Sequence, residues 1–99
     1  MASKIRRSSG NVFRDLGFSD GEAENLRIRS ELMTRLRKLI EDDDLTQAQA
    51  ARLLGVTQPR VSDLVRGRIE LFSIDTLVNM LAKAGVRVTV TARARTRAA

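Results

Sequence analysis

Apolar residues recur every three or four positions through much of this 99-residue chain, which is the spacing of amphipathic helices. Ser19 with Glu22 forms a capping-box signature, so a long helix should begin near Asp20. It should end in the acidic run of residues 41–44, because carboxylates oppose the helix dipole at a C-terminus. The preceding residues 12–18 are expected to form a short extended or irregular segment. The apolar face of the long helix consists of Leu32, Leu36, Leu39 and Ile40.

Two short helices are predicted next. Thr46 and Gln49 repeat the capping pattern and open a helix that runs to about Leu54, where Gly55 ends it. Thr57 caps the second helix, which tolerates Pro59 in its first turn and runs to about residue 66. The two helices are expected to turn an apolar face to the core, formed by Ala50, Leu53, Leu54, Val61, Leu64 and Val65.

The C-terminal third predicts one more helix and one strand. Ser73 and Asp75 open the helix, Leu77 and Leu81 lie on its core face, and Gly85 closes it. In residues 86–91 Val alternates with Arg and Thr, which is the pattern of a strand. A lone strand needs a partner for its backbone groups. The partner would be the same strand of a second copy, giving a homodimer, or residues 12–16 of the same chain.

Composition and charge narrow the possible functions. The chain contains no Cys and no His, and the acidic run lacks the ligand spacing of a calcium loop, so we expect no enzyme, no metal and no cofactor. With three Phe as its only aromatic residues it is poorly equipped to stack single-stranded bases. The absence of a signal peptide or a long apolar run predicts a cytoplasmic protein.

The positive charge is concentrated in the second half of the chain. Residues 46–99 hold nine basic and three acidic residues, whereas residues 12–45 hold six basic and nine acidic ones. Such a field favours a polyanionic partner. We therefore divide the chain into an N-terminal arm (1–19), one domain with its C-terminal strand (20–92) and a basic tail (93–99).

The stretch TQAQAARLLGVTQPRVSDLVRG, residues 46–67, combines the two short helices with a glycine-containing turn. That is the arrangement of a helix-turn-helix unit, whose second helix enters the major groove of duplex DNA. Close crossing needs a small residue, a glycine and a branched apolar residue, and Ala51, Gly55 and Val61 meet these needs. The stretch resembles the helix-turn-helix of the Xre/Cro repressor superfamily. The resemblance implies an all-α, five-helix lambda-repressor-like core, dimerisation and repression of a nearby promoter by a nucleoid-associated protein.

The resemblance extends to GNVFRDLGF, to RGRIELFSIDTLVNMLAKAG and to the Val-rich segment that follows. Together these are similar to a branch of HigA-like antitoxins, which pair with RelE/HigB-type toxins. The resemblance implies an antitoxin-type autorepressor, with the segment through Phe18 as the toxin-contacting part. The alternative is an interaction module that chiefly neutralises a toxin, with DNA binding secondary.

Candidate DNA contacts fall into two groups. Gln58 can pair with the N6 and N7 atoms of adenine, Arg60 with guanine or a phosphate, and Ser62 with a phosphate or a base edge. Asp63 can accept from cytosine N4, or is simply a solvated or arginine-paired side chain. Arg52 is a phosphate contact or a plain surface residue. The resemblance places a phosphate at Gln47, and the full set of expected phosphate contacts is Thr46, Gln47, Thr57, Arg66 and Arg68.

Overall fold

The structure is a computed structural model that describes residues 10–94. These residues form five α-helices and one 3-10 turn: α2 (Val12–Asp15), α3 (Asp20–Asp42), α4 (Gln47–Leu54), α5 (Gln58–Val65), η1 (Ile69–Leu71) and α6 (Ile74–Lys83). The predicted all-α class is therefore confirmed. The beginning of the predicted arm (1–9) and most of the predicted tail (95–99) lie outside the described residues. Within residues 10–94 no helix is long and apolar enough to span a membrane.

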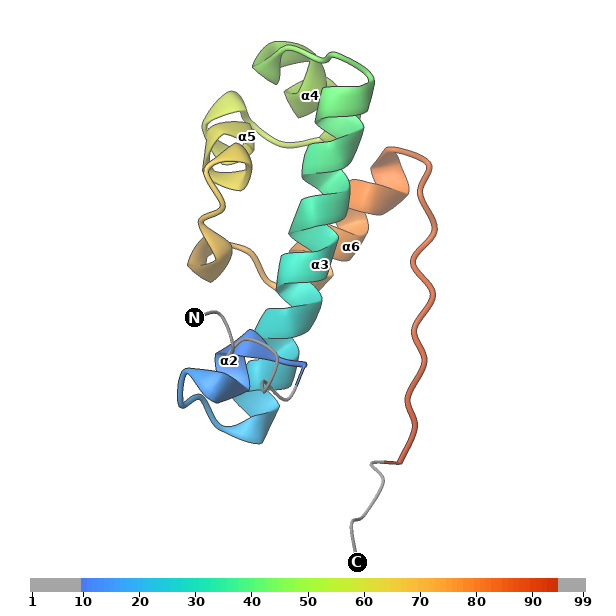
Figure 1. Cartoon of the computed structure of the whole chain (residues 1–99). Coiled ribbons are helices and arrows are strands. Elements are labelled where there is room, and N and C mark those ends of the chain that lie inside the picture. The colour runs from blue at the N-terminus through green and yellow to red at the C-terminus, as the bar shows by residue number, and fades with distance from the viewer. Residues whose placement is uncertain (1–9, 95–99) are drawn as a thin grey trace, which may run out of the picture.

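The long helix α3 is the element on which the others pack (Figure 1). α2 lies against its N-terminal end, α6 crosses it, and α4 and α5 lie beside its C-terminal half (Figure 1). α3 begins with the expected capping box: the amide N–H of Glu22 donates to Ser19 Oγ over 3.3 Å, and that of Ser19 donates to Glu22 Oε1 over 3.4 Å.

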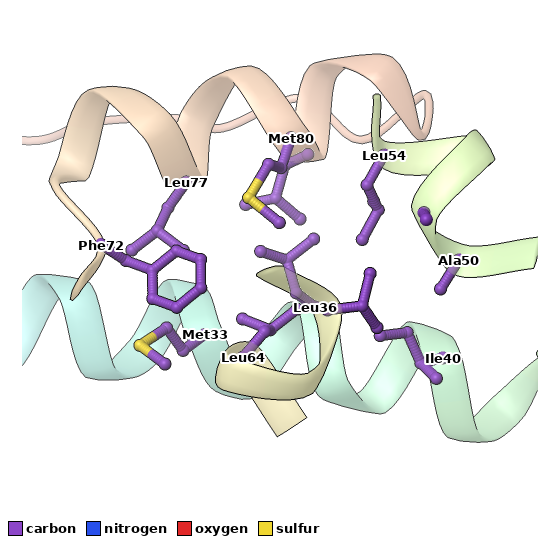
Figure 2. Close-up of a cluster of buried hydrophobic side chains, with 12 residues drawn as sticks. Met33, Leu36, Ile40, Ala50, Leu54, Leu64, Phe72, Leu77 and Met80 are labelled. Carbon is purple, nitrogen blue, oxygen red and sulfur yellow. The ribbon is translucent and has the colours of Figure 1, made fainter. Parts of the chain in front are cut away.

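One apolar core joins α3, α4, α5, Phe72 and α6 (Figure 2). Among its buried residues are the expected Leu54, Val61, Leu64, Leu77 and Leu81. The prediction of the core was wrong at two positions, since Leu53 is 37% exposed and Val65 is 41% exposed. A short helix buries a single stripe, and Leu53 falls beside the α4 stripe of Ala50, Ala51 and Leu54. Val65 is the last residue of α5, where the chain leaves the core.

Residues 12–15 are helical, which corrects the expected extended or irregular segment. Asn11 caps α2, because its Oδ1 accepts from the amide N–H groups of Phe13 (2.9 Å) and Arg14 (3.3 Å). The Asn11 side-chain amide also donates to the carbonyl of Ala23 in α3 over 3.2 Å. Asn11 is only 5% exposed, so one polar side chain both starts α2 and attaches it to α3.

The predicted strand at residues 86–91 is not formed within the described residues. A strand requires a paired neighbour, and residues 12–15, the possible partner within the chain, belong to a helix instead. The segment runs in extended form alongside α3 (Figure 1). Val86 and Val88 pack against the core, and residues 88–91 share a groove with Ile28 and Leu32. Val90 is 83% exposed.

The backbone is strained at Asp44, just after the C-terminal end of α3. Asp44 has a left-handed conformation (φ 52°), the one non-glycine residue among 10–94 with positive φ. The amide N–H of Leu45 then donates to the carbonyl of Ile40 over 3.0 Å, and that of Asp44 to the carbonyl of Glu41 over 3.1 Å. These two bonds form a Schellman motif, which normally places glycine at the left-handed position.

We predict that Asp44→Gly raises the free energy of unfolding by about 0.5–1 kcal/mol. Glycine adopts positive φ without steric strain, and the substitution removes a carboxylate that opposes the helix dipole; its greater freedom in the unfolded chain offsets part of the gain. Urea denaturation measures the change. Asp43→Gly is the matched control and should destabilise the protein, because Asp43 has φ −91°. A loss of stability in both variants would contradict the assignment of strain to Asp44.

Candidate nucleic-acid interface

The start of α4 presents backbone donors to solvent. The Thr46 hydroxyl accepts from the amide N–H of Gln49 over 3.1 Å, and Gln49 Oε1 accepts from the amide N–H of Thr46 over 2.9 Å. The amide N–H groups of Gln47 and Ala48 have no acceptor within residues 10–94. Gln47 itself is exposed. Free N–H groups at a helix N-terminus, together with a side-chain amide, suit an anion such as a phosphate.

The turn between α4 and α5 depends on Gly55. Its backbone is left-handed (φ 71°, ψ 33°), and the amide N–H of Val56 closes the turn on the carbonyl of Ala51 over 3.0 Å. A Cβ at this position would lie 2.6 Å from Cδ of Lys83, whose side chain crosses the turn. Ala51 (8% exposed) and Val61 (0%) are both buried in the core. The small residue Ala51 and the branched residue Val61 therefore lie in the core, and Gly55 lies in the turn, as the sequence predicted.

Helix α5 has a buried face and an outward face. Thr57 caps it by accepting from the amide N–H of Arg60 over 3.4 Å. Val61 and Leu64 point into the core with no exposed surface. Because each residue turns an α-helix by about 100°, the outward face holds Ser62, Asp63 and Arg66. By the same geometry Gln58 and Arg60, about 200° apart, lie on opposite flanks of that face.

Three arginines gather at the turn that follows α5. Gly67 has φ 75°, and a Cβ at this position would lie 3.7 Å from Nη1 of Arg37, which comes from α3. Arg66 and Arg68 flank Gly67, and Arg66 is exposed. Nε of Arg68 lies 3.9 Å from Oδ1 of Asp63, so Asp63 has the arginine-paired arrangement considered above. Arg37 was not among the residues predicted from the sequence, because only the packing of α3 beside α5 brings it to Gly67.

Two other cations of α3, Arg27 and Lys38, are paired with neighbouring carboxylates. Arg27 forms ion pairs with Glu24 (2.9 Å) and Glu31 (2.7 Å). The hydrogen bonds to Glu24, and then to Glu31, raise the pKa of Arg27 above its ordinary value. Among residues 10–94, Arg37, Arg52 and Arg66 have no carboxylate within ion-pair distance. Unpaired cations therefore lie on and beside α4 and α5, although Arg29 and Arg35 of α3 are also without an ion pair in the described residues.

Comparison with known proteins agrees with this geometry. Residues 12–93 match a family model described as "Helix-turn-helix domain". A solved structure named "Putative XRE Family Transcriptional Regulator" superposes with a TM-score of 0.71 and 32% sequence identity, covering 79% of this chain and 88% of that chain. The comparison with curated protein sequences gave no match. The chain belongs to the XRE family of helix-turn-helix proteins.

In this XRE-family chain most of the candidate residues lie at three places. Thr46 and Gln47 begin α4, Thr57 and Gln58 begin α5, and the last group follows α5 at Gly67 (Arg66, Arg68 and the newly found Arg37). Both threonine hydroxyls are engaged as cap acceptors, which leaves their O–H free to donate. Arg60 differs from the others, because its guanidinium lies 4.4 Å from the centre of the Phe72 ring.

Proposed function

We propose that this XRE-family protein is a sequence-specific regulator, a repressor, that binds double-stranded DNA through α4 and α5. The observation that carries the proposal is the outward face of α5, fixed by two buried residues, with unpaired cations beside it. A helix held in this way can enter the major groove, where base edges distinguish sequences. The name of the similar solved structure supports the same class of function.

Within this proposal the residues have different roles. The residues assigned to base edges are Gln58, Arg60, Ser62 and Asp63. The capped starts of α4 and α5, and the arginines at the turn after α5, are assigned to phosphates. The residues assigned to DNA phosphates are Thr46, Gln47, Thr57, Arg66 and Arg68, to which the structure adds Arg37 as a candidate. Phosphate contacts set the position of a protein on DNA, whereas base contacts supply specificity. The protein would act at the nucleoid.

An antitoxin-type autorepressor is the finer form of the proposal. It rests on the resemblance of the chain to HigA-like antitoxins and on an exposed apolar surface at the N-terminal end. Its exposed apolar side chains are Val12 (59% exposed), Leu16 (71%) and Phe18 (44%), in and directly after α2, which lies away from α4 and α5 (Figure 1). A RelE/HigB-type toxin is the proposed occupant. If toxin neutralisation were the main role, DNA binding would be secondary.

A homodimer is the proposed binding form. Within residues 10–94 the backbone groups of residues 87–94 make no hydrogen bond, although the segment is extended and rich in Val and Thr. Antiparallel pairing with a second copy would satisfy them. Pairing centred on Thr89 sets Arg87 opposite Thr91, whereas pairing centred on Val90 would set Arg87 opposite Arg93 and is disfavoured by repulsion.

We predict that substitutions in the two groups have different effects. Gln58→Ala should weaken binding to a selected operator by roughly 1–3 kcal/mol and leave binding to random duplex nearly unchanged. Replacing an arginine should weaken binding to all sequences alike, and each replacement should lower the slope of log affinity against log salt by about one. The variants are Arg66→Ala, Arg68→Ala and Arg37→Ala. Titration of each variant at several salt concentrations gives both quantities.

Arg35→Ala is the matched control for Arg37→Ala, since both arginines are exposed on α3, on either side of the buried Leu36. It should change the salt slope less than Arg37→Ala. The assignment of roles is wrong if Gln58→Ala reduces specific and random binding equally, or if the three arginine variants leave the slope unchanged.

For the dimer we predict that Thr89→Pro lowers the association constant of the protein. Proline removes a backbone N–H from the ladder, while Thr89 is exposed in the single chain, so the fold itself should persist. Thr89→Val, which favours a strand, is the control. Sedimentation at micromolar concentrations measures association. A wild-type monomer under these conditions, or equal dimerisation of both variants, would refute strand pairing.

For the toxin partner we predict that Leu16→Glu weakens binding to the product of an adjacent toxin-type reading frame by at least tenfold. A charge in the apolar surface would have to be desolvated on docking, and Leu16 is too exposed to matter for the fold. Operator binding should be unchanged, because Leu16 lies outside α4, α5 and the turn at Gly67. Calorimetry with purified toxin that shows equal binding by wild type and Leu16→Glu would contradict this assignment.

A further inference from the structure

Arg60, the third residue of α5, rests on an aromatic ring that comes from another part of the chain. Its guanidinium carbon lies 4.4 Å from the centroid of the Phe72 ring, a cation–π contact. Phe72 is 1% exposed and lies in the core beside Met33 and Leu77 (Figure 2). The ring is therefore fixed by the core, and Arg60 stacks on a rigid surface.

The backbone beneath this ring is fixed as well. Nη1 of Arg29, in α3, donates to the carbonyl of Phe72 over 3.3 Å and to the carbonyl of Ile69 over 3.1 Å. Nε of Arg29 donates to Oδ1 of Asn25 over 2.7 Å, which orients the guanidinium. α3 thus holds the segment from η1 to Phe72, and that segment in turn supports a side chain of α5.

Stacking engages the face of the Arg60 guanidinium and leaves its edge available. No hydrogen bond or ion pair joins this guanidinium to another residue in the part of the chain that the structure describes. The N–H donors of a guanidinium lie in one plane, and two of them match the O6 and N7 acceptors of guanine. An arginine loses much rotamer entropy when it binds, and stacking removes part of that freedom beforehand. Gln58, by contrast, is exposed and has no such support.

We propose that Phe72 is a positioning residue that holds Arg60 ready to read a guanine in the operator. The proposal rests on the proposed DNA-binding function and adds a specificity determinant outside the helix-turn-helix unit. Phe72 never contacts DNA; it acts only through the side chain stacked on it.

A double-mutant cycle tests the coupling. A randomised duplex library is first enriched on the wild-type protein, and the selected duplex is then changed one base pair at a time. Arg60→Ala should lose discrimination at one G·C pair. Phe72→Leu should lower discrimination at the same pair by about three- to tenfold, the size of a partly desolvated cation–π contact, with the salt slope unchanged. In the Arg60→Ala background Phe72→Leu should have no further effect on discrimination.

Two variants separate positioning from a loss of stability. Leu77→Val removes one methylene from the core near Phe72 but keeps the ring, so it should leave discrimination unchanged. Arg60→Lys keeps the charge and leaves the core intact, yet it should lose discrimination, because lysine lacks the planar fork. In the free protein, nuclear magnetic resonance should show upfield ring-current shifts for the Arg60 side chain, which Phe72→Leu abolishes.

Each outcome identifies which claim fails. Equal discrimination by wild type and Phe72→Leu, or additive effects in the cycle, would overturn the role of Phe72 while DNA binding stands. If Arg60→Ala weakened binding to all sequences alike, Arg60 would be a phosphate contact, and the proposed positioning role of Phe72 would also be overturned. Failure of the wild-type protein to enrich any sequence would instead contradict the proposed function.

Discussion

The close crossing of α4 and α5 is the constraint on which the rest of the structure depends. Gly55 makes it possible by adopting a left-handed backbone under the side chain of Lys83, and Ala51 and Val61 fill the space between the helices. The crossing alone would not hold two helices of eight residues each, because isolated helices of this length are marginal in water. α3 and α6 supply buried apolar side chains, among them Leu36, Leu77 and Leu81. Val61 and Leu64 pack among them, so that α5 presents its polar face in a fixed orientation.

The fold also separates surfaces of different character. The arginine Arg27 of α3 is neutralised by two carboxylates, whereas Arg66 beside α5 has no such partner in the described part of the chain. The most exposed large apolar side chains are Val12 and Leu16, in and directly after α2, and Val90 in the C-terminal segment. Leu53 on α4 and Val65 on α5 expose smaller fractions. Polar and cationic surface suits a polyanion, and exposed apolar surface suits a protein. This separation is why one small domain can be proposed to bind DNA, a second copy and a toxin at different places.

The local signals in the sequence were sufficient for most of the fold. Capping pairs at Ser19 and Thr46, and the glycine at residue 55, placed helix boundaries that the structure confirms, because these features act over a few residues. What the sequence did not indicate depends on tertiary contacts. Asn11, a common type of cap residue, also joins α2 to α3 through its bond to the carbonyl of Ala23, and Arg37 approaches Gly67 only because α3 packs beside α5.

The C-terminal strand shows a different limit of sequence reasoning. The alternation of Val with polar residues correctly indicates an extended backbone, but a strand is defined by its neighbour, and the described chain offers none. For the candidate site, side-chain chemistry and the family resemblance indicated which residues of α5 could contact DNA, but neither could show that Arg60 stacks on Phe72. The roles assigned to individual side chains therefore remain predictions.

The central claim, that α4 and α5 bind duplex DNA, is tested most directly by amide chemical-shift mapping. A ¹⁵N-labelled protein is titrated with a duplex enriched from a random library, and the shifted residues are placed on the structure. We predict saturable shift changes concentrated at residues 46–49 and 57–68, with the amide signals of α2 nearly unchanged. Changes centred on α2 or on residues 86–94, with α4 and α5 unaffected, would contradict it.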